Sequence, residues 1–549
     1  MSSFDPAPAG RREPEYPLRV LLWEATLRCN LFCEFCGSRC GEADTSGELT
    51  ADEICRVFRE VAGAYDASRI MIDVSGGEPL LRRDLFDIMR YAVSLGYRWG
   101  IVTNGTLLTD EIAAKLEDCA LRTASVSIDG LGPLHDSIRG GKGSFDRVVA
   151  AIGRLRRIRT MEHIQVTTVV SSRNHARLPE LRAFLRTLPI DSWRVCPVDP
   201  IGRARDHREV MPGAEILART MDFIVESRAM PLPFAVMTSC SHYLGRYELR
   251  VRDMPFHCYT GRQLGSVLAN GDIFVCANVP RRPELIQGNV RRDSFVEVWE
   301  SGFRFFRDPE SRRTGRCASC AYFARCRGDS MHTWDPDAKE PQFCCLEQGI
   351  GPETDAADAL ETLSPEALID RCRTNGAPVP ALRVAAQSAA RDIAVLAPEA
   401  SRGLFGIFRW GEPAGPSPRE QIACLLGRLC RRDIAEEAFI ADIREVVELP
   451  AADATEDTLF VGEDMFREAR RLAAARGLSF LGFVHSHPGP LSVAMSAGDW
   501  ELQKRMYLSD WTTALNLIVN PQRQRLAAYA GPNADHIELL LLGVRQPNG

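Results

Sequence analysis

The sequence predicts an α/β fold, and three observations lead to this class. From Leu18 to about residue 215, short apolar runs alternate with stretches of helical periodicity, which is typical of a parallel sheet with crossover helices. Polar residues follow directly after several of these runs. Near the carboxyl end, another apolar run contains two histidines two positions apart. The strands expected in the first region are 20–26, 70–75, 99–103, 123–128, 164–170 and 192–197.

Length and composition are those of an ordinary globular protein. The 549 residues are 45% hydrophobic and 26% charged, and this length predicts three or four domains. A net charge of -6 gives no electrostatic reason to expect binding to nucleic acid or to an anionic membrane. Residues 1–17 lack an apolar signal-peptide core, and no run approaches a membrane span. We therefore expect a cytoplasmic protein whose 18 cysteines are reduced and include metal ligands.

Three cysteines follow the first expected strand in one short loop. Three residues separate Cys29 from Cys33, and two separate Cys33 from Cys36. A [4Fe-4S] cluster normally takes four thiolates, so a loop with three leaves one iron open to a small chelating molecule. A structural zinc loop completed by Cys40 is the alternative for these residues alone.

The second expected strand ends in Ser75, and Gly76, Gly77, Glu78 and Pro79 follow it. Glycines at this position let the backbone approach a ligand closely. With the cysteine triad, this motif resembles the radical S-adenosylmethionine (SAM) enzymes. The resemblance implies a partial (β/α)6 barrel, a SAM-binding [4Fe-4S] cluster held by the triad, and contact between the Gly-Gly-Glu-Pro segment and the methionyl amine of SAM.

Further SAM-pocket residues are expected at the ends of later strands, because binding and catalytic residues of parallel α/β sheets lie at the carboxyl ends of the strands. Asn104 follows the third strand. The resemblance makes Ser127 and Asp129, after the fourth strand, candidates for contact with the SAM ribose. Asn174 and Arg203 occupy positions where related enzymes bind SAM or substrate, although either residue can also serve only in a turn.

A second group of cysteines resembles the SPASM extension of radical SAM enzymes, which carries one or two auxiliary [4Fe-4S] clusters. Its members are Cys258, Cys276 after the intervening Gly271, Cys317, Cys320, Cys326, and the adjacent pair Cys344 and Cys345. By resemblance, Cys317, Cys320, Cys326 and one of the adjacent pair would hold the outer cluster. The chain has Ser330 where the pattern has an inner-cluster cysteine. Cys258 and Cys276 therefore have three possible states: a cluster completed by oxygen, imidazole or a cysteine of the adjacent pair, a cluster with an open iron, or no cluster.

The carboxyl-terminal histidines lie in an apolar run at 478–488, where strand alternation directs His485 and His487 to the same side. Asp499 follows at an expected helix start, near Ser496, and Glu420 opens an upstream Glu-x-x-x-x-Leu-x-Gly segment. This set resembles the JAB/MPN (JAMM) metalloproteases, in which that upstream segment is expected as a helix. The resemblance implies a catalytic Zn2+ on His485, His487 and Asp499, Glu420 as general base and Ser496 as oxyanion donor. One departure is the eleven residues between His487 and Asp499, where the family usually has ten.

These features predict four segments. They are a radical SAM core at 18–215, a SPASM-like domain at 216–350, a linker with one or two short helices at 351–389, and a JAMM domain at 390–549.

The predicted function is bifunctional: SAM-dependent radical crosslinking or oxidation of a peptide, coupled to zinc-dependent hydrolysis of a peptide or isopeptide bond. An electron donor such as ferredoxin or flavodoxin would supply the radical half. Only 28 residues precede Cys29, too few for a winged-helix leader-binding domain, so peptide recognition would need a separate leader-binding protein.

Two alternatives stay open. The radical site would act on a small metabolite while the JAMM site processes a ubiquitin-like or sulfur-carrier protein, or an inactive JAMM domain would serve as a substrate-binding scaffold.

Overall fold

The structure is a computed structural model of the whole chain. It describes residues 16–42, 45–239, 241–252, 256, 258–352, 381–384, 393–409, 421–433, 438–449, 463–487, 499, 502, 515–521, 524–530 and 535–542. The chain divides into two compact units. One comprises residues 1–224, 232–244 and 256–351, and the other comprises 225–231, 245–255 and 352–549.

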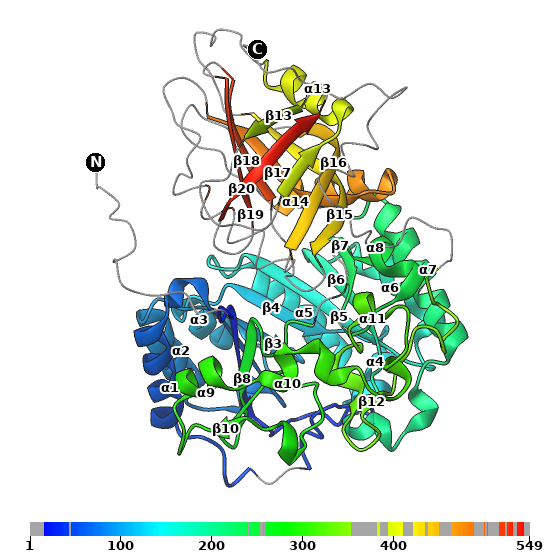
Figure 1. The fold of residues 1–549 in the computed structure, drawn as a ribbon. Coiled ribbons are helices and arrows are strands. Elements are labelled where there is room, and N and C mark those ends of the chain that lie inside the picture. Colours follow the sequence, from blue (N-terminus) through cyan, green and yellow to red (C-terminus); the bar gives the residue numbers. More distant parts are fainter. Residues whose placement is uncertain are drawn as a thin grey trace. The chain divides into compact units, whose positions relative to one another are not determined.

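The amino-terminal unit is built on a 10-stranded sheet with the order β10-β9-β8-β1-β2-β3-β4-β5-β6-β7 (Figure 1). Neighbouring strands from β8 through β1 to β7 are parallel, whereas β9 and β10 join antiparallel. The strands are β1 (Val20–Thr26), β2 (Met71–Gly76), β3 (Arg98–Thr103), β4 (Thr123–Ser127), β5 (His163–Val170), β6 (Ser192–Pro197), β7 (Ala235–Thr238), β8 (Leu264–Val267), β9 (Asp272–Phe274) and β10 (Gly288–Asn289). The six strands expected from the sequence are therefore confirmed.

Helices connect the parallel strands, and α1 packs beside α2 (Figure 1). A capping box between Thr50 and Glu53 fixes the start of α1, since each side chain accepts a backbone N–H group of the other residue. The helices in this part of the chain are α1 (Ala51–Ala64), α2 (Leu85–Ser94), α3 (Asp110–Asp118), α4 (Pro133–Arg139), α5 (Ser144–Arg156), α6 (Leu178–Leu185), α7 (Ala214–Ala229), α8 (Glu248–Val251), α9 (Phe295–Ser301), α10 (Arg304–Arg307) and α11 (Phe323–Cys326). A short hairpin, β11 (Trp334–Asp335) and β12 (Glu340–Pro341), follows them.

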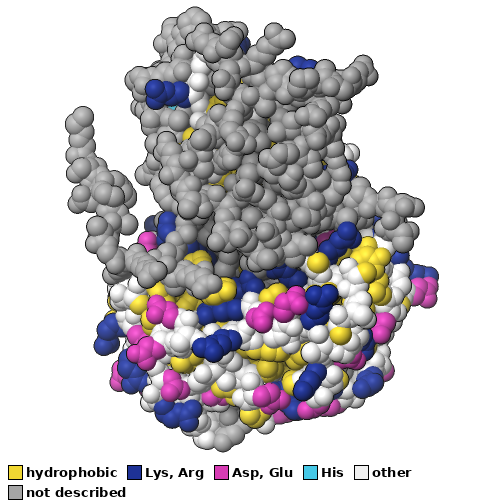
Figure 2. All heavy atoms as spheres, viewed as in Figure 1, with side chains coloured by type: hydrophobic (Ala, Val, Ile, Leu, Met, Phe, Trp, Pro, Cys, Tyr) yellow, Lys and Arg dark blue, Asp and Glu magenta, His cyan; other side chains and the backbone are white. Residues whose placement is uncertain are grey.

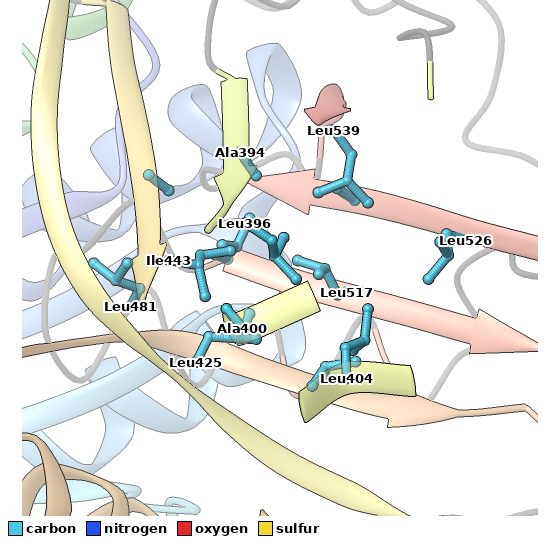
Figure 3. Close-up of a cluster of buried hydrophobic side chains, with 14 of the residues drawn as sticks. Ala394, Leu396, Ala400, Leu404, Leu425, Ile443, Leu481, Leu517, Leu526 and Leu539 are labelled. Carbon is cyan, nitrogen blue, oxygen red and sulfur yellow. The ribbon is translucent and has the colours of Figure 1, made fainter. Parts of the chain in front are cut away.

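The carboxyl-terminal unit contains an 8-stranded sheet with the order β13-β20-β14-β16-β15-β17-β18-β19. Strand β20 also pairs with β19, which closes most of the sheet on itself. Its elements are β13 (Ala381–Val384), β14 (Ile393–Leu396), α13 (Pro398–Ile407), β15 (Ile422–Asp433), β16 (Ala438–Leu449), α14 (Glu463–Ala475), β17 (Ser479–Ser486), β18 (Leu515–Asn520), β19 (Arg525–Ala530) and β20 (Asp535–Leu542). Figure 3 shows its larger core, a cluster of buried side chains that includes Leu404 of α13 and Leu425, Leu517 and Leu539 of the sheet.

Two expectations for this unit were wrong. The segment after Glu420 was expected to be a helix, but residues 422–433 form strand β15. Strand β15 lies between β16 and β17, and its residues alternate between two cores, with Leu425 in one core and Cys424 in the other. This period-2 burial on both faces is that of a central strand. The linker was expected to extend to residue 389, but β13 already pairs with β20.

The surface agrees with the modest net charge. Figure 2 shows acidic and basic side chains interspersed over the visible face of the amino-terminal unit. None of the described helices combines the length and apolar character that a membrane span requires.

Candidate functional site

The loop after β1 brings Cys29, Cys33 and Cys36 to the wall of one cavity of about 280 Å³, called here the thiol cavity. The cavity lies at the carboxyl ends of the parallel strands, with lining residues from the ends of β2 to β6. Buried Leu31 and Phe35 of the loop pack in one cluster with residues of α4 and of the segment after β6. This packing fixes the loop on the end of the sheet.

Each of the three thiols is approached by an N–H group. The amide Nδ2 of Asn104 lies 4.0 Å from Cys29 Sγ, Nη1 of Arg139 lies 3.7 Å from Cys33 Sγ, and the backbone N of Cys40 lies 3.4 Å from Cys36 Sγ. Such donors stabilise thiolates and adjust the potential of an iron–sulfur cluster. The donor set therefore fits a cluster with three protein ligands.

The electrostatics separate these thiols from Cys40. Burial raises the pKa of Cys33, and the Arg139 guanidinium opposes that rise. A hydrogen bond from the Cys40 thiol lowers the pKa of Cys36, while the same bond and burial raise the pKa of Cys40. The Cys40 thiol therefore lies within hydrogen-bonding distance of Cys36.

Gly76, the last residue of β2, and the next residue, Gly77, pack so closely against backbone that neither position has room for a side chain. A Cβ atom at Gly76 would lie 2.2 Å from the carbonyl oxygen of Thr26, and one at Gly77 would lie 2.1 Å from that of Arg28. The N–H groups of Gly77 and Glu78 donate to these two oxygens at 2.7 and 2.9 Å. The Gly-Gly step thus fastens the end of β2 to the residues immediately before Cys29.

Of the residues expected to bind SAM, five line the thiol cavity: Gly76, Gly77, Asn104, Ser127 and Arg203. The other four, Glu78, Pro79, Asp129 and Asn174, do not line it.

Glu78 lies behind the cavity wall and joins strand ends. Its buried carboxylate accepts the Thr103 hydroxyl at 2.9 Å, the Asn104 backbone N–H group at 2.8 Å and the Leu80 N–H group at 3.2 Å. Burial raises the pKa of Glu78 to about 7 despite these donors. In this structure Glu78 positions Asn104, which in turn approaches Cys29.

Asp129 and Asn174 organise the end of the sheet. The Asp129 carboxylate pairs with Arg139 and accepts the Val169 N–H group at 2.8 Å. The Asn174 amide donates to the carbonyl oxygen of Asp129 at 2.9 Å. Arg139, which the sequence reading missed, therefore links Asp129 to Cys33.

Arg203 holds the cysteine loop. Its guanidinium donates to the carbonyl oxygens of Cys33 at 2.8 Å and Cys40 at 3.1 Å, and to Glu42 at 2.7 Å. It also lies 3.9 Å from the ring centre of Phe32. These contacts give Arg203 a structural task in addition to its place on the cavity wall.

The auxiliary cysteines form a second group. Burial, together with the neighbouring Cys320 and Cys344 thiols, raises the pKa of Cys317 to about 11. Burial also raises the pKa of Cys326 well above its usual value, with contributions from Asp329, Cys345 and Cys317. The thiols expected for the outer cluster are thus near one another, and both adjacent cysteines, 344 and 345, belong to the group.

The residues expected at the inner cluster are engaged differently. The Cys276 thiol lies 3.5 Å from Nε2 of His332, and the Ser330 hydroxyl accepts the His332 N–H group at 3.1 Å. Burial lowers the pKa of the Arg312 guanidinium, and the nearby Cys258 and Cys326 thiols partly oppose this change.

A larger cavity of about 730 Å³ shares Pro197 and Val198 with the thiol cavity. Its lining is rich in proline and includes Arg205, Arg208 and Arg282. Asp337 pairs with Arg282 at 2.7 Å, whereas no carboxylate among the described residues pairs with Arg205 or Arg208. This cavity has the size and charge to take a ligand that carries carboxylates.

In the carboxyl-terminal unit, His485, His487 and Asp499 form a separate group of side chains that could hold a metal ion. The Nε2 atoms of His485 and His487 lie 3.2 Å apart. Asp499 brings Oδ1 to 2.7 Å from Nε2 of His485 and Oδ2 to 3.2 Å from Nε2 of His487. Two imidazoles on one tetrahedral zinc with bonds of 2.0–2.1 Å have their nitrogens about 3.3 Å apart. The buried trio therefore fits one zinc ion.

Glu420 and Ser496, the expected general base and oxyanion donor, lie outside the described residues. The neighbour of Glu420 is placed: Gln421 donates its N–H group to the Ser486 hydroxyl at 2.8 Å, and its carbonyl oxygen accepts the Ser486 N–H group at 3.0 Å. Ser486 stands between the two histidines in the chain.

Three buried or half-buried thiols at the carboxyl ends of parallel strands define a cofactor-dependent α/β enzyme. Residues 23–185 match the family model of the radical SAM superfamily, and residues 258–321 match that of the SPASM iron–sulfur cluster-binding domain. The chain belongs to the radical SAM superfamily and uses SAM and [4Fe-4S] clusters.

Similar proteins cover the amino-terminal part of the chain. The AdoMet-dependent heme synthase of Methanosarcina barkeri is 34% identical over 350 residues, which are 60% of this chain and 97% of the relative. Mycofactocin maturase MftC of Mycobacterium tuberculosis is 30% identical over 322 residues, which are 57% of this chain and 78% of the relative. The structure of Streptococcus suis SuiB bound to S-adenosylmethionine aligns with a TM-score of 0.48 at 16% identity, covering 60% of this chain and 77% of SuiB.

Proposed function

We propose that the chain is a bifunctional enzyme that modifies a peptide by SAM-dependent radical chemistry and hydrolyses a peptide or isopeptide bond with zinc. The observation that carries the proposal is the convergence of His485, His487 and Asp499 in a chain that belongs to the radical SAM superfamily.

In the radical half, Cys29, Cys33 and Cys36 would hold the SAM-binding cluster. When bound, that cluster supplies the electron that cleaves SAM reductively and so starts hydrogen abstraction from the substrate. The protein contributes the N–H groups at the sulfurs and the wall formed by Gly76, Gly77 and neighbouring strand ends. Cys317, Cys320, Cys326 and one of the adjacent pair 344 and 345 would hold the outer auxiliary cluster. A ferredoxin or flavodoxin is the expected electron donor.

A peptide is the substrate we propose for this half. Mycofactocin maturase is among the similar proteins, and the match with this chain covers 78% of its length. The 730 Å³ cavity beside the thiol cavity offers an apolar, proline-rich wall, and Arg205 and Arg208 would bind acidic groups of such a peptide. A separate leader-binding protein would present the peptide.

In the carboxyl-terminal half, His485, His487 and Asp499 would bind zinc, which supplies Lewis acidity and an activated water at an open coordination position. Glu420 would accept the proton of the attacking water and pass it to the leaving amine. Ser496 would donate to the developing oxyanion. The hydrogen bonds between Gln421 and Ser486 support this role of Glu420, because they anchor its chain neighbour next to the histidines.

The two activities are assigned to separate segments. Residues 18–215 and 216–350 would be the radical SAM core and the SPASM-like domain, and the JAMM domain would begin with the sheet at residue 381. Each half has its own buried core. Lesions in one site should therefore leave the metal content of the other unchanged.

Anaerobic preparation of the full chain tests the proposal. We expect about one zinc and about eight irons per chain, four per cubane. SAM and dithionite should yield 5′-deoxyadenosine, and a variant with Cys29, Cys33 and Cys36 all changed to alanine should yield none while it keeps its zinc. Production of 5′-deoxyadenosine by that variant would refute the radical assignment, and a chain without zinc would refute the hydrolytic one.

The second candidate substrate is a small anionic metabolite, with the zinc site processing a carrier protein. The similarity to AdoMet-dependent heme synthase and the unpaired arginines of the larger cavity favour it. Neighbouring genes would distinguish the candidates: a short precursor peptide supports the first, and a small protein that ends in Gly-Gly supports the second.

A further inference from the structure

Five polar side chains from distant parts of the sequence form one hydrogen-bonded chain, called here the buried relay. Its members in order are Cys276, His332, Asp199, His242 and Asp329. The successive distances are 3.5 Å from Cys276 Sγ to His332 Nε2, 3.0 Å from His332 Nδ1 to Asp199 Oδ2, 2.9 Å from Asp199 Oδ1 to His242 Nε2, and 3.0 Å from His242 Nδ1 to Asp329 Oδ2. Each ring nitrogen of His242 and His332 thus lies within hydrogen-bonding distance of another member of the relay.

The surroundings fix the relay in place. Asp329 accepts the Tyr243 N–H group at 2.7 Å and the Thr333 hydroxyl at 3.3 Å. Asp329 also adopts a left-handed φ of 62°, a conformation uncommon outside glycine. The Phe343 ring stacks on His242 with centroids 3.8 Å apart. His242, His332 and Asp329 are all buried.

The charges of the relay compensate one another. Burial alone would lower the pKa of His242, but the carboxylates of Asp329 and Asp199 raise it to about 9. Burial alone would raise the pKa of the Cys276 thiol, but the neighbouring His332 imidazole lowers it below its usual value. Each imidazole of the relay thus faces at least one carboxylate, and His332 also faces the Cys276 thiol.

An inner auxiliary cubane does not fit these residues. A [4Fe-4S] cluster normally takes four protein ligands, one at each iron. The inner-cluster cysteine of the family pattern is Ser330 here, and its hydroxyl caps the turn that carries His332. Cys276 and His332 are 3.5 Å apart, which suits a hydrogen bond or two ligands on one metal atom. It does not suit ligands on two different irons of a cubane.

We propose that this chain has no inner auxiliary cluster and that the buried relay takes its place as the wall between the two cavities. Asp199 and His332 line the thiol cavity, and His242 lines the larger cavity. The hydrogen bond from His332 to Asp199 therefore fixes the orientation of the His332 ring at the wall of the thiol cavity. The inference rests on the proposed function only for the identity of the outer cluster.

Iron counting on matched cysteine variants tests this inference. The full chain is reconstituted anaerobically with iron and sulfide alone, and iron and sulfide are measured together with the electron paramagnetic resonance spectrum of the reduced protein. Cys276→Ala should leave the iron content and the spectrum unchanged. Cys320→Ala, the control in the outer group, should lose about four irons and one cluster signal.

Loss of about four irons in Cys276→Ala, or about twelve irons in the unchanged chain, would overturn the inference. If Cys276→Ala does not fold, Cys258→Ala replaces it, with the same expected iron content and the same refuting result. A chain with about four irons that Cys276→Ala leaves unchanged would support the inference while refuting the outer cluster of the proposed function.

Discussion

Replacement of Gly77 by alanine should damage the radical site without replacing any proposed cluster ligand. The new Cβ atom would lie 2.1 Å from the Arg28 carbonyl oxygen and 3.1 Å from Cys29 Cβ. Neither neighbour is the end of a flexible side chain, so the end of β2 must move away from the cysteine loop. Two hydrogen bonds span this junction, from Gly77 to Thr26 at 2.7 Å and from Glu78 to Arg28 at 2.9 Å.

The expected cost follows from these contacts. Each of the two hydrogen bonds contributes about 1 kcal/mol, and overpacking adds about 1–3 kcal/mol, for a total of roughly 3–5 kcal/mol. A domain of this size shifts its melting temperature by about 2 °C per kcal/mol, so we expect a decrease of roughly 6–10 °C. Thermal loss of the iron–sulfur absorbance, measured under argon, reports on this unit alone. Iron content and 5′-deoxyadenosine formation should fall as well.

Gly153→Ala is the matched control. Gly153 lies inside α5, and a Cβ atom there meets nothing within 4 Å. Alanine in a helix interior is favoured over glycine by about 0.5–1 kcal/mol, so this variant should be slightly more stable with unchanged iron. A Gly77→Ala protein with the iron content and melting temperature of the unchanged chain would refute the close-packing explanation of the Gly-Gly step.

Three further predictions concern single side chains. Cys33→Ala should abolish 5′-deoxyadenosine formation and leave zinc, measured by emission spectrometry, unchanged. His485→Ala should lose zinc, whereas Glu420→Gln should keep zinc and lose hydrolysis, because an amide cannot accept the proton of the attacking water. Substrate cleavage is measured by mass spectrometry. If Glu420→Gln cleaves at the unchanged rate, the domain is a binding module and not a hydrolase of this kind. Burial lowers the pKa of His135 to about 4, so this group is neutral in the folded protein and protonated in the unfolded chain below about pH 6.5. Its contribution of roughly 3 kcal/mol is complete above that pH and is lost as the pH falls toward 4. His135→Gln should flatten this part of the profile of denaturant midpoint against pH, and an unchanged profile would contradict the reasoning.

The sequence predicted the parallel sheet well because each strand is a separate apolar run. The expected strand 20–26 coincides with β1 (Val20–Thr26), and 192–197 coincides with β6 (Ser192–Pro197). Residues 422–427 carry the same signal, but the family resemblance led us to expect a helix there. Continuous apolar residues with no polar helical face indicate a strand buried on both sides, and β15 is such a strand.

The candidate site was predictable only where local motifs carry it. Cys29, Cys33 and Cys36 lie within eight residues, and the Gly-Gly step directly follows a strand. Arg139 is 106 residues from Cys33, whose sulfur it approaches, and no local pattern joins the two. The buried relay is less visible still, because 133 residues separate Asp199 from His332. Only the order of the strands brings such positions to one edge of the sheet.

The position of His332 also explains why the substitution at Ser330 need not weaken the fold. Losing one cysteine from a four-ligand site leaves the remaining thiols buried without a metal, and buried polar groups without partners cost about 1–3 kcal/mol each. Here Cys276 is hydrogen-bonded to His332, and further hydrogen bonds link His332 through Asp199 and His242 to Asp329. A cluster site can therefore be exchanged for a hydrogen-bonded network at little cost, provided that every member keeps two partners.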